Sequence, residues 1–206
     1  MYNLINAATK EQYLSTNPGE MAKATILFIH GGGEGAYSAD KKLVDRLSKS
    51  LDNKYEIIFP KVPDESDPDY EKYKITIEEE LNKITSGLIL SGHSLGACLM
   101  LKYISEREIK KGIYGIFLLS APFWGPGGWE FEGFSINNEL AAKKVSNTPV
   151  FFYHGTHDEI VPFSHLALYK AKFPNAKFRE MAGQGHQFED DLSEVAKDIT
   201  GLGLHF

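Results

Sequence analysis

The sequence predicts a three-layer α/β/α sandwich built on a mostly parallel sheet of six strands. Six short apolar, β-prone runs alternate with six segments of helical periodicity, which is the pattern of a parallel sheet covered by helices on both faces. Glycine-rich or polar stretches follow several of these runs, and such stretches meet at the edge of the sheet where ligands bind. A length of 206 residues suits one domain, expected to span residues 1–206.

Each element of this sheet is expected from a local pattern. The run Ala24–His30 is continuously β-prone, as in a strand buried on both faces. Further strands are expected at 55–60, 88–90, 113–119, 150–154 and 176–181. Apolar residues at helical spacing predict helices over 39–51, 71–84, 95–106, 137–145, 163–173 and 190–200. Residues 1–22 carry little pattern and are expected to pack as a surface arm.

Composition excludes several classes of partner and compartment. With 22 Lys and Arg against 28 Asp and Glu, the net charge is −6, which argues against nucleic acid or an anionic membrane surface as the main partner. The single cysteine, Cys98, permits no internal disulfide and favours a reducing, cytoplasmic location. No signal peptide is expected at the N-terminus, and no apolar run approaches the roughly 18 residues of a membrane span.

A candidate nucleophile stands between the third strand and the helix after it. Residues Gly92-His93-Ser94-Leu95-Gly96 fit the G-x-S-x-G elbow, in which a sharp turn lifts the serine hydroxyl above the strand end. The amide of Leu95 would then point from a helix N-terminus at an oxyanion above Ser94. The motif alone is weak, since this composition predicts about 0.1 chance matches, and the alternative is a structural turn serine.

The remaining catalytic groups follow in the chain order serine, acid, histidine that an elbow-type hydrolase requires. Asp158 and His186 each lie just after a predicted strand, so both should reach the edge of the sheet that carries Ser94. A histidine can take the proton of a serine hydroxyl near neutral pH, and an acid fixes the tautomer of that histidine. The alternatives are a turn aspartate, with Glu159 as a competing acid, and a solvent-exposed loop histidine.

The first strand ends in His30-Gly31-Gly32-Gly33, a loop that can bring a second backbone N–H to the oxyanion. Gly32 and Gly33 are the candidate donors, because glycine lets the backbone approach a substrate closely. The same loop, over 31–36, also fits the dinucleotide fingerprint G-x-G-x-x-A. That fingerprint requires an acid at the end of the second strand, which instead reads Phe59-Pro60-Lys61. The nicotinamide alternative is therefore disfavoured.

The loop after the fourth strand combines aromatic residues with glycine. Phe123, Trp124 and Trp129 could wall an apolar pocket for an acyl or alcohol group, although aromatic residues more commonly join the core. A metal site is not expected, because the sequence holds no HExxH motif and no cysteine pair.

Four segments together resemble the landmarks of the α/β-hydrolase superfamily: 30–33, 92–96, 155–162 and 183–188. The resemblance covers about residues 24–200 and is greatest to small members without a cap domain, including retinoblastoma-binding-protein-like serine hydrolases. It implies hydrolysis of an ester, thioester or similar acyl bond through an acyl-serine intermediate, with no cofactor and a small-molecule acyl substrate. The first two strands of the full family sheet are missing here or reduced to the N-terminal arm.

The expected function is therefore a carboxylesterase-like serine hydrolase with the triad Ser94, Asp158 and His186. One alternative is a non-catalytic module that keeps the hydrolase fold and acts by binding a partner protein. The other alternative is the nicotinamide-dependent enzyme considered above.

Overall fold

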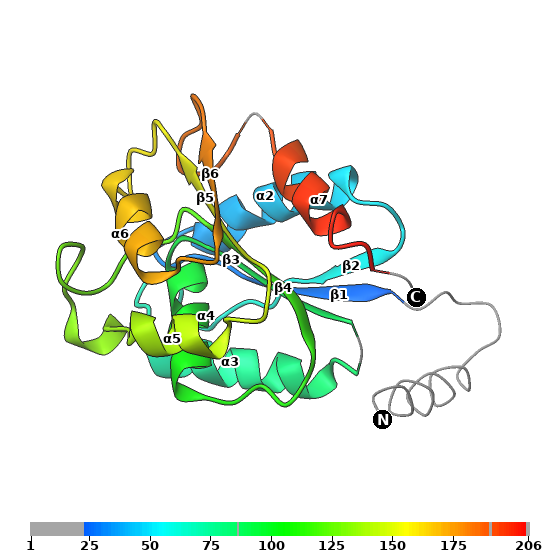
Figure 1. Ribbon diagram of the computed structural model, residues 1–206, viewed down its shortest axis with the longest axis horizontal. Coiled ribbons are helices and arrows are strands. Elements are labelled where there is room, and N and C mark those ends of the chain that lie inside the picture. The colour runs from blue at the N-terminus through cyan, green and yellow to red at the C-terminus, as the bar shows by residue number, and fades with distance from the viewer. Residues whose placement is uncertain (1–22, 86, 190, 205–206) are drawn as a thin grey trace.

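Six parallel strands form one sheet in the computed structural model, which describes residues 23–85, 87–189 and 191–204 (Figure 1). The expected arm at 1–22 lies outside these residues. Along the sheet the strands run in the order β2-β1-β3-β4-β5-β6, and each neighbouring pair is parallel. The strands are β1 (Ala24–Ile29), β2 (Tyr55–Ile58), β3 (Leu88–His93), β4 (Ile113–Leu119), β5 (Val150–Gly155) and β6 (Lys177–Met181).

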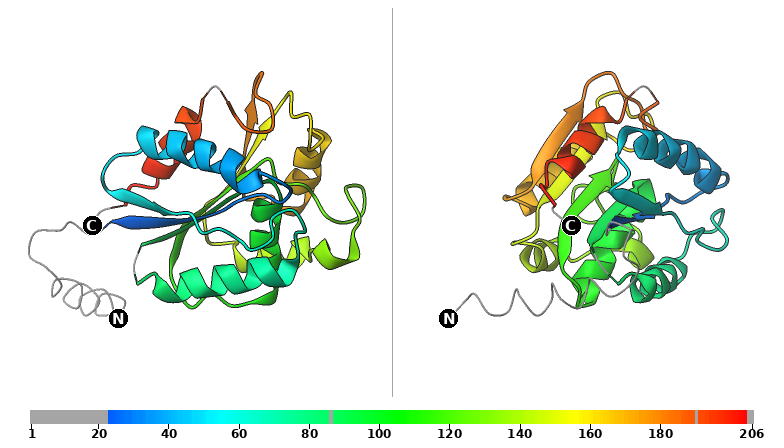
Figure 2. Two further views of the ribbon diagram at one scale, coloured as in Figure 1. Left: turned by 180° about the vertical axis from the view of Figure 1, so that it is seen from behind. Right: turned by 90° about the vertical axis from the view of Figure 1, so that its right-hand side faces the viewer.

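Helices cover both faces of this sheet, which confirms the predicted three-layer sandwich (Figure 1, Figure 2). One face carries α2 (Ala36–Ser50) and α7 (Ser193–Thr200). The opposite face carries α3 (Tyr70–Lys83), α4 (Ser94–Glu106), α5 (Asn138–Lys144) and α6 (Ser164–Lys172). In the described ranges, every helix is too short or too polar to span a membrane.

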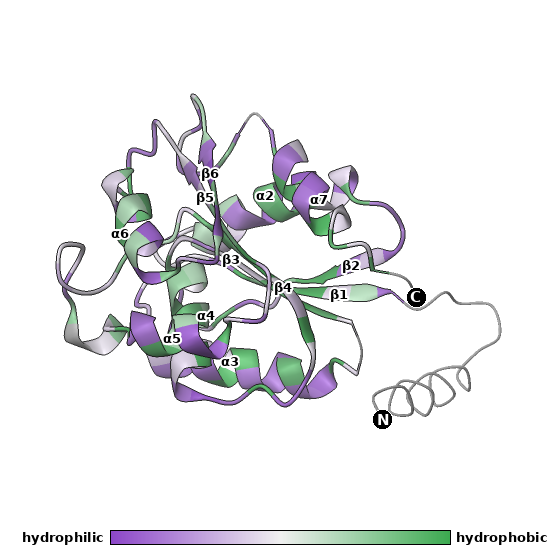
Figure 3. Cartoon of the chain, viewed as in Figure 1, coloured by the Kyte–Doolittle hydropathy of each residue, from purple (hydrophilic) through white to green (hydrophobic). Residues whose placement is uncertain are grey.

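The central strands are buried on both sides, as their continuous apolar runs predict. On β1, Leu27 and Ile29 join the core beneath α3 and α4, whereas Ile26 and Phe28 join the core beneath α2 and α7. This alternation follows from the two-residue period of side chains along a strand. Figure 3 shows the consequence, with the central strands coloured mostly as hydrophobic, whereas the edge strand β6 and the outer sides of the helices are largely hydrophilic.

Strand β3 is longer than its apolar run. The prediction ended at Leu90, but Ser91, Gly92 and His93 continue the ladder against β4. The strand therefore runs directly into α4 at Ser94, with no loop residue between the two elements.

The direction of the chain through the sheet reverses between β1 and β3, because β2 lies on the far side of β1. In parallel sheets a ligand site is expected at the carboxyl ends of the strands beside such a reversal. The longest connection at this edge, residues 120–137, holds only the 3-10 turn Glu132–Phe134. No cap domain is therefore inserted in the described part of the chain.

Candidate active site

Ser94 stands at a strained turn between β3 and α4. Its φ angle is +51°, in the left-handed region that residues with a side chain rarely adopt. Neighbouring glycines make this turn possible, because a methyl group on Gly96 would lie 2.3 Å from the carbonyl oxygen of His30. A methyl group on Gly92 would likewise lie 2.9 Å from the backbone of Ala97. The glycines around the serine thus reflect two close approaches, of Gly96 to the end of β1 and of Gly92 to the first turn of α4.

His186 and Asp158, from the loops after β6 and β5, form a direct pair. The Nδ1 atom of His186 lies 3.0 Å and 2.9 Å from the two carboxylate oxygens of Asp158. Because a carboxylate only accepts, Nδ1 must carry a proton, which leaves Nε2 able to act as a base. The structure therefore brings together the acid and the base that the sequence predicts.

The carboxylate of Asp158 is fully buried and held as an anion. Its Oδ1 atom accepts backbone N–H groups from Ile160 and Val161, at 2.9 Å and 2.8 Å. Burial alone would raise the pKa of Asp158, but the bond and charge of His186, together with the N–H of Val161 and the hydroxyl of Ser120, lower this pKa to about 2.

Glu159, the competing acid, makes a different contact. Its carboxylate accepts the backbone N–H of His186 at 3.3 Å and does not meet the imidazole ring. The acid that contacts the ring is Asp158, and Glu159 instead helps to hold the loop that carries the histidine.

The loop of His186 is fastened to the elbow through its backbone. The Nε2 atom of His93, the residue before Ser94, lies 2.9 Å from the carbonyl oxygen of His186, and the two imidazole rings are 4.6 Å apart. The hydroxyl of Ser120 also points to this carbonyl oxygen, at 3.4 Å. The Ser94 hydroxyl itself donates no hydrogen bond to any described residue, so its approach to Nε2 of His186 remains a prediction.

The glycine loop after β1 distinguishes between the two predicted oxyanion donors. The amide of Gly31 donates to Oδ2 of Asp40 at 2.7 Å, and the amide of Gly33 donates to the carbonyl oxygen of Glu65 at 2.6 Å. Among the described residues, the amide of Gly32 has no such acceptor. Gly32 also packs against Leu95, because a methyl group on Gly32 would lie 2.5 Å from the Leu95 side chain. These contacts favour Gly32 over Gly33.

The same two bonds weigh against the dinucleotide alternative. That fingerprint needs the glycine amides to approach a pyrophosphate. Two of the three amides in 31–33 already donate to groups within the protein.

An aromatic cavity of about 780 Å³ opens beside the glycine loop. Pro68, one of its lining residues, would lie 3.1 Å from a methyl group on Gly32, so the cavity and the loop adjoin. Its walls are Asp67, Pro68, Trp124, Gly128, Trp129, Glu130, Phe131 and Phe134.

Two of the three predicted pocket residues line this cavity. Trp124 and Trp129 do so, with their rings edge to face at 5.4 Å. Phe123 corrects the expectation, because it is only 3% exposed and packs edge to face against Tyr169 in the core. The aromatic loop therefore divides, with its first ring in the core and the next two at the cavity.

Sequence reasoning missed a buried carboxylate on α2. Asp40 is 1% exposed, and its Oδ1 atom lies 2.8 Å from Nδ1 of His93. A signal was present, because Asp40 occupies the apolar stripe of the helix, ahead of Leu43, Val44 and Leu47. An acid on a buried stripe requires a partner, although the sequence does not identify that partner.

A family model described as serine hydrolase matches residues 40–191. The fold is similar to Est1E from Butyrivibrio proteoclasticus, with a TM-score of 0.63, 16% identity and coverage of 90% of this chain and 88% of that one. It is also similar to acyl-protein thioesterase 2 of Zea mays, with a TM-score of 0.61, 20% identity and coverage of 91% and 96%.

A third similar structure is the ydeN gene product of B. subtilis, with a TM-score of 0.64, 19% identity and coverage of 88% and 99%. Among curated protein sequences, none matches the chain. The solved structures support the α/β-hydrolase fold of the chain, and the family model covers most of its length.

Proposed function

The chain belongs to the serine hydrolase family, and we propose that it is a carboxylesterase that cleaves an ester or related acyl bond through an acyl-serine intermediate. The observation that carries the proposal is the pair of His186 and Asp158 beside a serine at a strained strand-to-helix turn. A hydroxyl becomes a competent nucleophile when an oriented base takes its proton, and this arrangement supplies both the base and the group that orients it.

In the first half of the reaction, the Ser94 hydroxyl oxygen forms a bond to the carbonyl carbon of the substrate while its proton moves to Nε2 of His186. The buried anion of Asp158 stabilises the imidazolium that results. The tetrahedral intermediate then breaks its bond to the leaving alcohol oxygen, which takes the proton from Nε2. The products of this half are the free alcohol and the acyl ester of Ser94.

In the second half, water attacks the acyl ester as Nε2 of His186 takes one of its protons. The tetrahedral intermediate collapses, the bond to the Ser94 oxygen breaks, and that oxygen recovers the proton from His186. The acyl group leaves as a carboxylic acid, and the enzyme returns to its starting state.

Two backbone amides stabilise the negative oxygen of both tetrahedral intermediates. The amide of Leu95 lies in the first turn of α4, where backbone N–H groups lack partners within the helix. The amide of Gly32 is the second donor, supported by its position against Leu95 and by the engagement of both neighbouring amides. Removing one such donor from a hydrolase typically lowers kcat by about 10²- to 10³-fold.

The aromatic cavity is the proposed site for the acyl or alcohol group of the substrate. Its rings, including Trp124 and Trp129, favour an apolar or aromatic group. One solved structure in the comparison is titled as Est1E with ferulic acid bound, and another is titled as an acyl-protein thioesterase. Both titles are compatible with acyl substrates, so an aromatic acyl ester and a thioester are the first two substrate classes to assay.

The test is a series of initial rates on p-nitrophenyl esters of increasing acyl length, with wild type beside Ser94→Ala. Ser48→Ala is the matched control, because Ser48 is exposed on α2. We expect a rate with a chain-length optimum for wild type and the control, and no rate above background for Ser94→Ala. Full activity in Ser94→Ala would overturn the assignment of the nucleophile.

A fluorophosphonate probe distinguishes the enzyme from the binding-module alternative. The probe should label wild type and fail to label Ser94→Ala, because it reacts with activated serine hydroxyls. A folded wild-type protein that neither turns over esters nor takes the probe would favour the non-catalytic module.

A further inference from the structure

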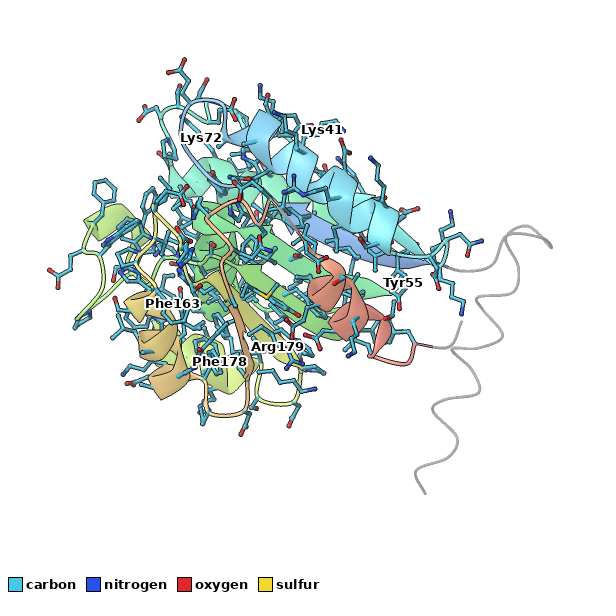
Figure 4. The ribbon with its side chains drawn as sticks, turned by 90° about the horizontal axis from the view of Figure 1, so that it is seen from above. Lys41, Tyr55, Lys72, Phe163, Phe178 and Arg179 are labelled. Atoms are coloured by element: carbon cyan, nitrogen blue, oxygen red, sulfur yellow. The ribbon has the colours of Figure 1, made fainter. Side chains whose placement is uncertain are left out.

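Asp40 lies on the buried side of α2. The next residue, Lys41, is on the outer side of the helix, where it pairs with the exposed Asp45 (Figure 4). Asp40 is instead 1% exposed. An ionised carboxylate in such surroundings is costly unless polar partners surround it. Its partners therefore indicate why an acid occupies this position.

Three segments of the candidate active site converge on this one carboxylate. Its Oδ2 atom accepts the amide of Gly31, in the glycine loop, at 2.7 Å. Its Oδ1 atom lies 2.8 Å from Nδ1 of His93, in the elbow, and accepts Nε2 of Gln187 at 3.2 Å. Gln187 follows His186 directly. The loop after β1, the last residue of β3 and the loop after β6 thus share a single anion.

His93 extends this connection to the backbone of the predicted base. Its Nε2 atom bonds to the carbonyl oxygen of His186 at 2.9 Å, and its Nδ1 atom lies 2.8 Å from Oδ1 of Asp40 in a contact between charges rather than an aligned hydrogen bond. The carbonyl oxygen of His186 is an acceptor, so Nε2 of His93 carries a proton. The buried carboxylate beside Nδ1 favours the doubly protonated, charged form of the ring, which pairs with the Asp40 anion.

The charges around His93 agree with this assignment. Burial lowers the pKa of His93, but the charge and contact of Asp40, the carbonyl oxygen of His186 and the more distant Asp158 outweigh burial and raise it above the ordinary value. Burial raises the pKa of Asp40, and the charge of His93 together with the Gly31 and Gln187 bonds reverses that effect.

We propose that Asp40 and His93 form a second, sealed Asp–His pair whose role is to position the catalytic groups. The pair fixes the glycine loop, the elbow and the His186 loop relative to one another, so that Gly32, Ser94 and His186 meet in reactive geometry. The inference rests on the proposed esterase function for its catalytic part. Asp40 and His93 are positioning residues, since neither needs to touch the substrate.

An ion pair is well suited to this role. A buried pair adds little net stability compared with apolar residues of similar volume, so its retention inside a domain requires another explanation. The Asp40 carboxylate is also directional, because the amide groups of Gly31 and Gln187 that donate to it must approach at favourable angles. A displacement of about 1 Å in a catalytic group can cost about 10²-fold in rate, which makes such directionality valuable.

The test compares Asp40→Asn, Asp40→Ala and the control Asp45→Asn in the full chain. Asp40→Asn keeps the volume of the side chain and an acceptor for the Gly31 amide, but removes the charge. Asp45→Asn removes a carboxylate from the same helix, and the Asp45 side chain is more than half exposed to solvent. The fluorophosphonate probe is used on a separate sample to count active sites, so that kcat is expressed per folded, reactive site.

Asp40→Asn is expected to lower kcat per titrated site by about ten- to a hundredfold, with KM changed by less than about twofold. Asp45→Asn should match wild type, and Asp40→Ala should be more affected than Asp40→Asn. A purely structural role would lower the amount of folded enzyme and leave kcat per site unchanged. Wild-type kcat in Asp40→Asn would therefore overturn the proposal.

A nitrogen NMR measurement tests the pair without any substrate. On titration with pH, wild-type His93 should keep protons on both ring nitrogens to a higher pH than His93 of Asp40→Asn does, and the Gly31 amide should exchange with solvent more slowly in wild type. Equal titration of His93 in the two proteins would overturn the inference, and this readout holds even if no ester is hydrolysed and the proposed function fails.

Discussion

Two buried Asp–His pairs of the candidate active site, Asp158–His186 and Asp40–His93, lie side by side, and they are proposed to have different tasks. In both pairs, Nδ1 of the histidine lies 2.9 Å or less from a carboxylate oxygen. The difference lies at the other nitrogen. Nε2 of His93 is engaged by the carbonyl oxygen of His186, whereas Nε2 of His186 has no partner among the described residues. The centroids of the two imidazole rings are 4.6 Å apart.

The comparison teaches that the residue types of a pair do not determine its task. Nε2 of His93 is engaged by a carbonyl oxygen and its Nδ1 lies against a buried carboxylate, so neither nitrogen is open to a substrate, in keeping with the proposed positioning role. A histidine with one nitrogen unengaged can accept a proton, so His186 can act as a base. Availability of Nε2 is therefore the feature that separates the two roles.

The largest change in kcat expected from this comparison follows replacement of the two histidines. His186→Gln should lower kcat by about 10⁴-fold, because the base is lost, and His93→Gln should lower it by about ten- to a hundredfold, because only geometry suffers. Initial rates on a saturating p-nitrophenyl ester, normalised to titrated sites, measure both. Equal losses in the two variants would break the distinction between base and positioning residue.

The next largest effect concerns the glycine loop that the Asp40 pair holds. Gly32→Ala should lower kcat by about 10²- to 10³-fold, because the added methyl group would meet the Leu95 side chain and displace the proposed donor. Gly112→Ala is the control, since a methyl group there has open space within 4 Å. An unchanged kcat in Gly32→Ala would remove Gly32 from the oxyanion site.

A smaller effect, on stability, separates Asp158 from an ordinary surface acid. Its pKa in the folded protein is about 2, below the ordinary 3.8. Its contribution to the free energy of unfolding is therefore present above pH 3.8 and is lost as pH falls toward 2. The difference of nearly two pKa units corresponds to about 2 kcal/mol.

Urea unfolding of wild type and Asp158→Asn between about pH 7 and pH 2 measures how much the ionised carboxylate stabilises the fold. The gap in unfolding free energy between the two proteins should be widest near neutral pH and should narrow below about pH 4. A gap that stays constant down to pH 2 would show that the carboxylate is not stabilised in its charged form.

The smallest effect expected is on substrate charge. The aromatic cavity carries the carboxylates of Asp67 and Glu130, and no lysine or arginine is among its lining residues. A cationic ester should therefore exceed a matched anionic ester in kcat/KM by up to about tenfold at low salt, and added salt should reduce the difference. Asp67→Asn combined with Glu130→Gln should abolish the preference, whereas Asp45→Asn should retain it.

Local pattern predicted the elements of the fold because its signals are local. Apolar runs located six strands and their alternation with helices, and the elbow motif located the turn at Ser94. The extension of β3 to His93 depends on pairing with β4, so the apolar run alone could not reveal it.

The finer features of the site depend on contacts between distant segments. The preference for Gly32 over Gly33 rests on Glu65, whose carbonyl oxygen accepts the amide of Gly33. The role proposed for His93 rests on its contact with Asp40, and a single sequence shows no more than an acid on an apolar helix face. Such features need the folded chain, because nothing within a few residues of each position specifies them.

Helix α2 holds the loop of His186 at two points, which has a consequence for synthesis of the protein. Asp40 meets the side chain of Gln187 across 147 residues of sequence, and Arg46 donates to the backbone carbonyl of Gln187 across 141 residues. A ribosome delivers the helix early and the loop late. On the proposed mechanism, the serine is therefore synthesised long before its base, and we expect the growing chain to stay inert toward acyl compounds until residues 186–188 have emerged and docked.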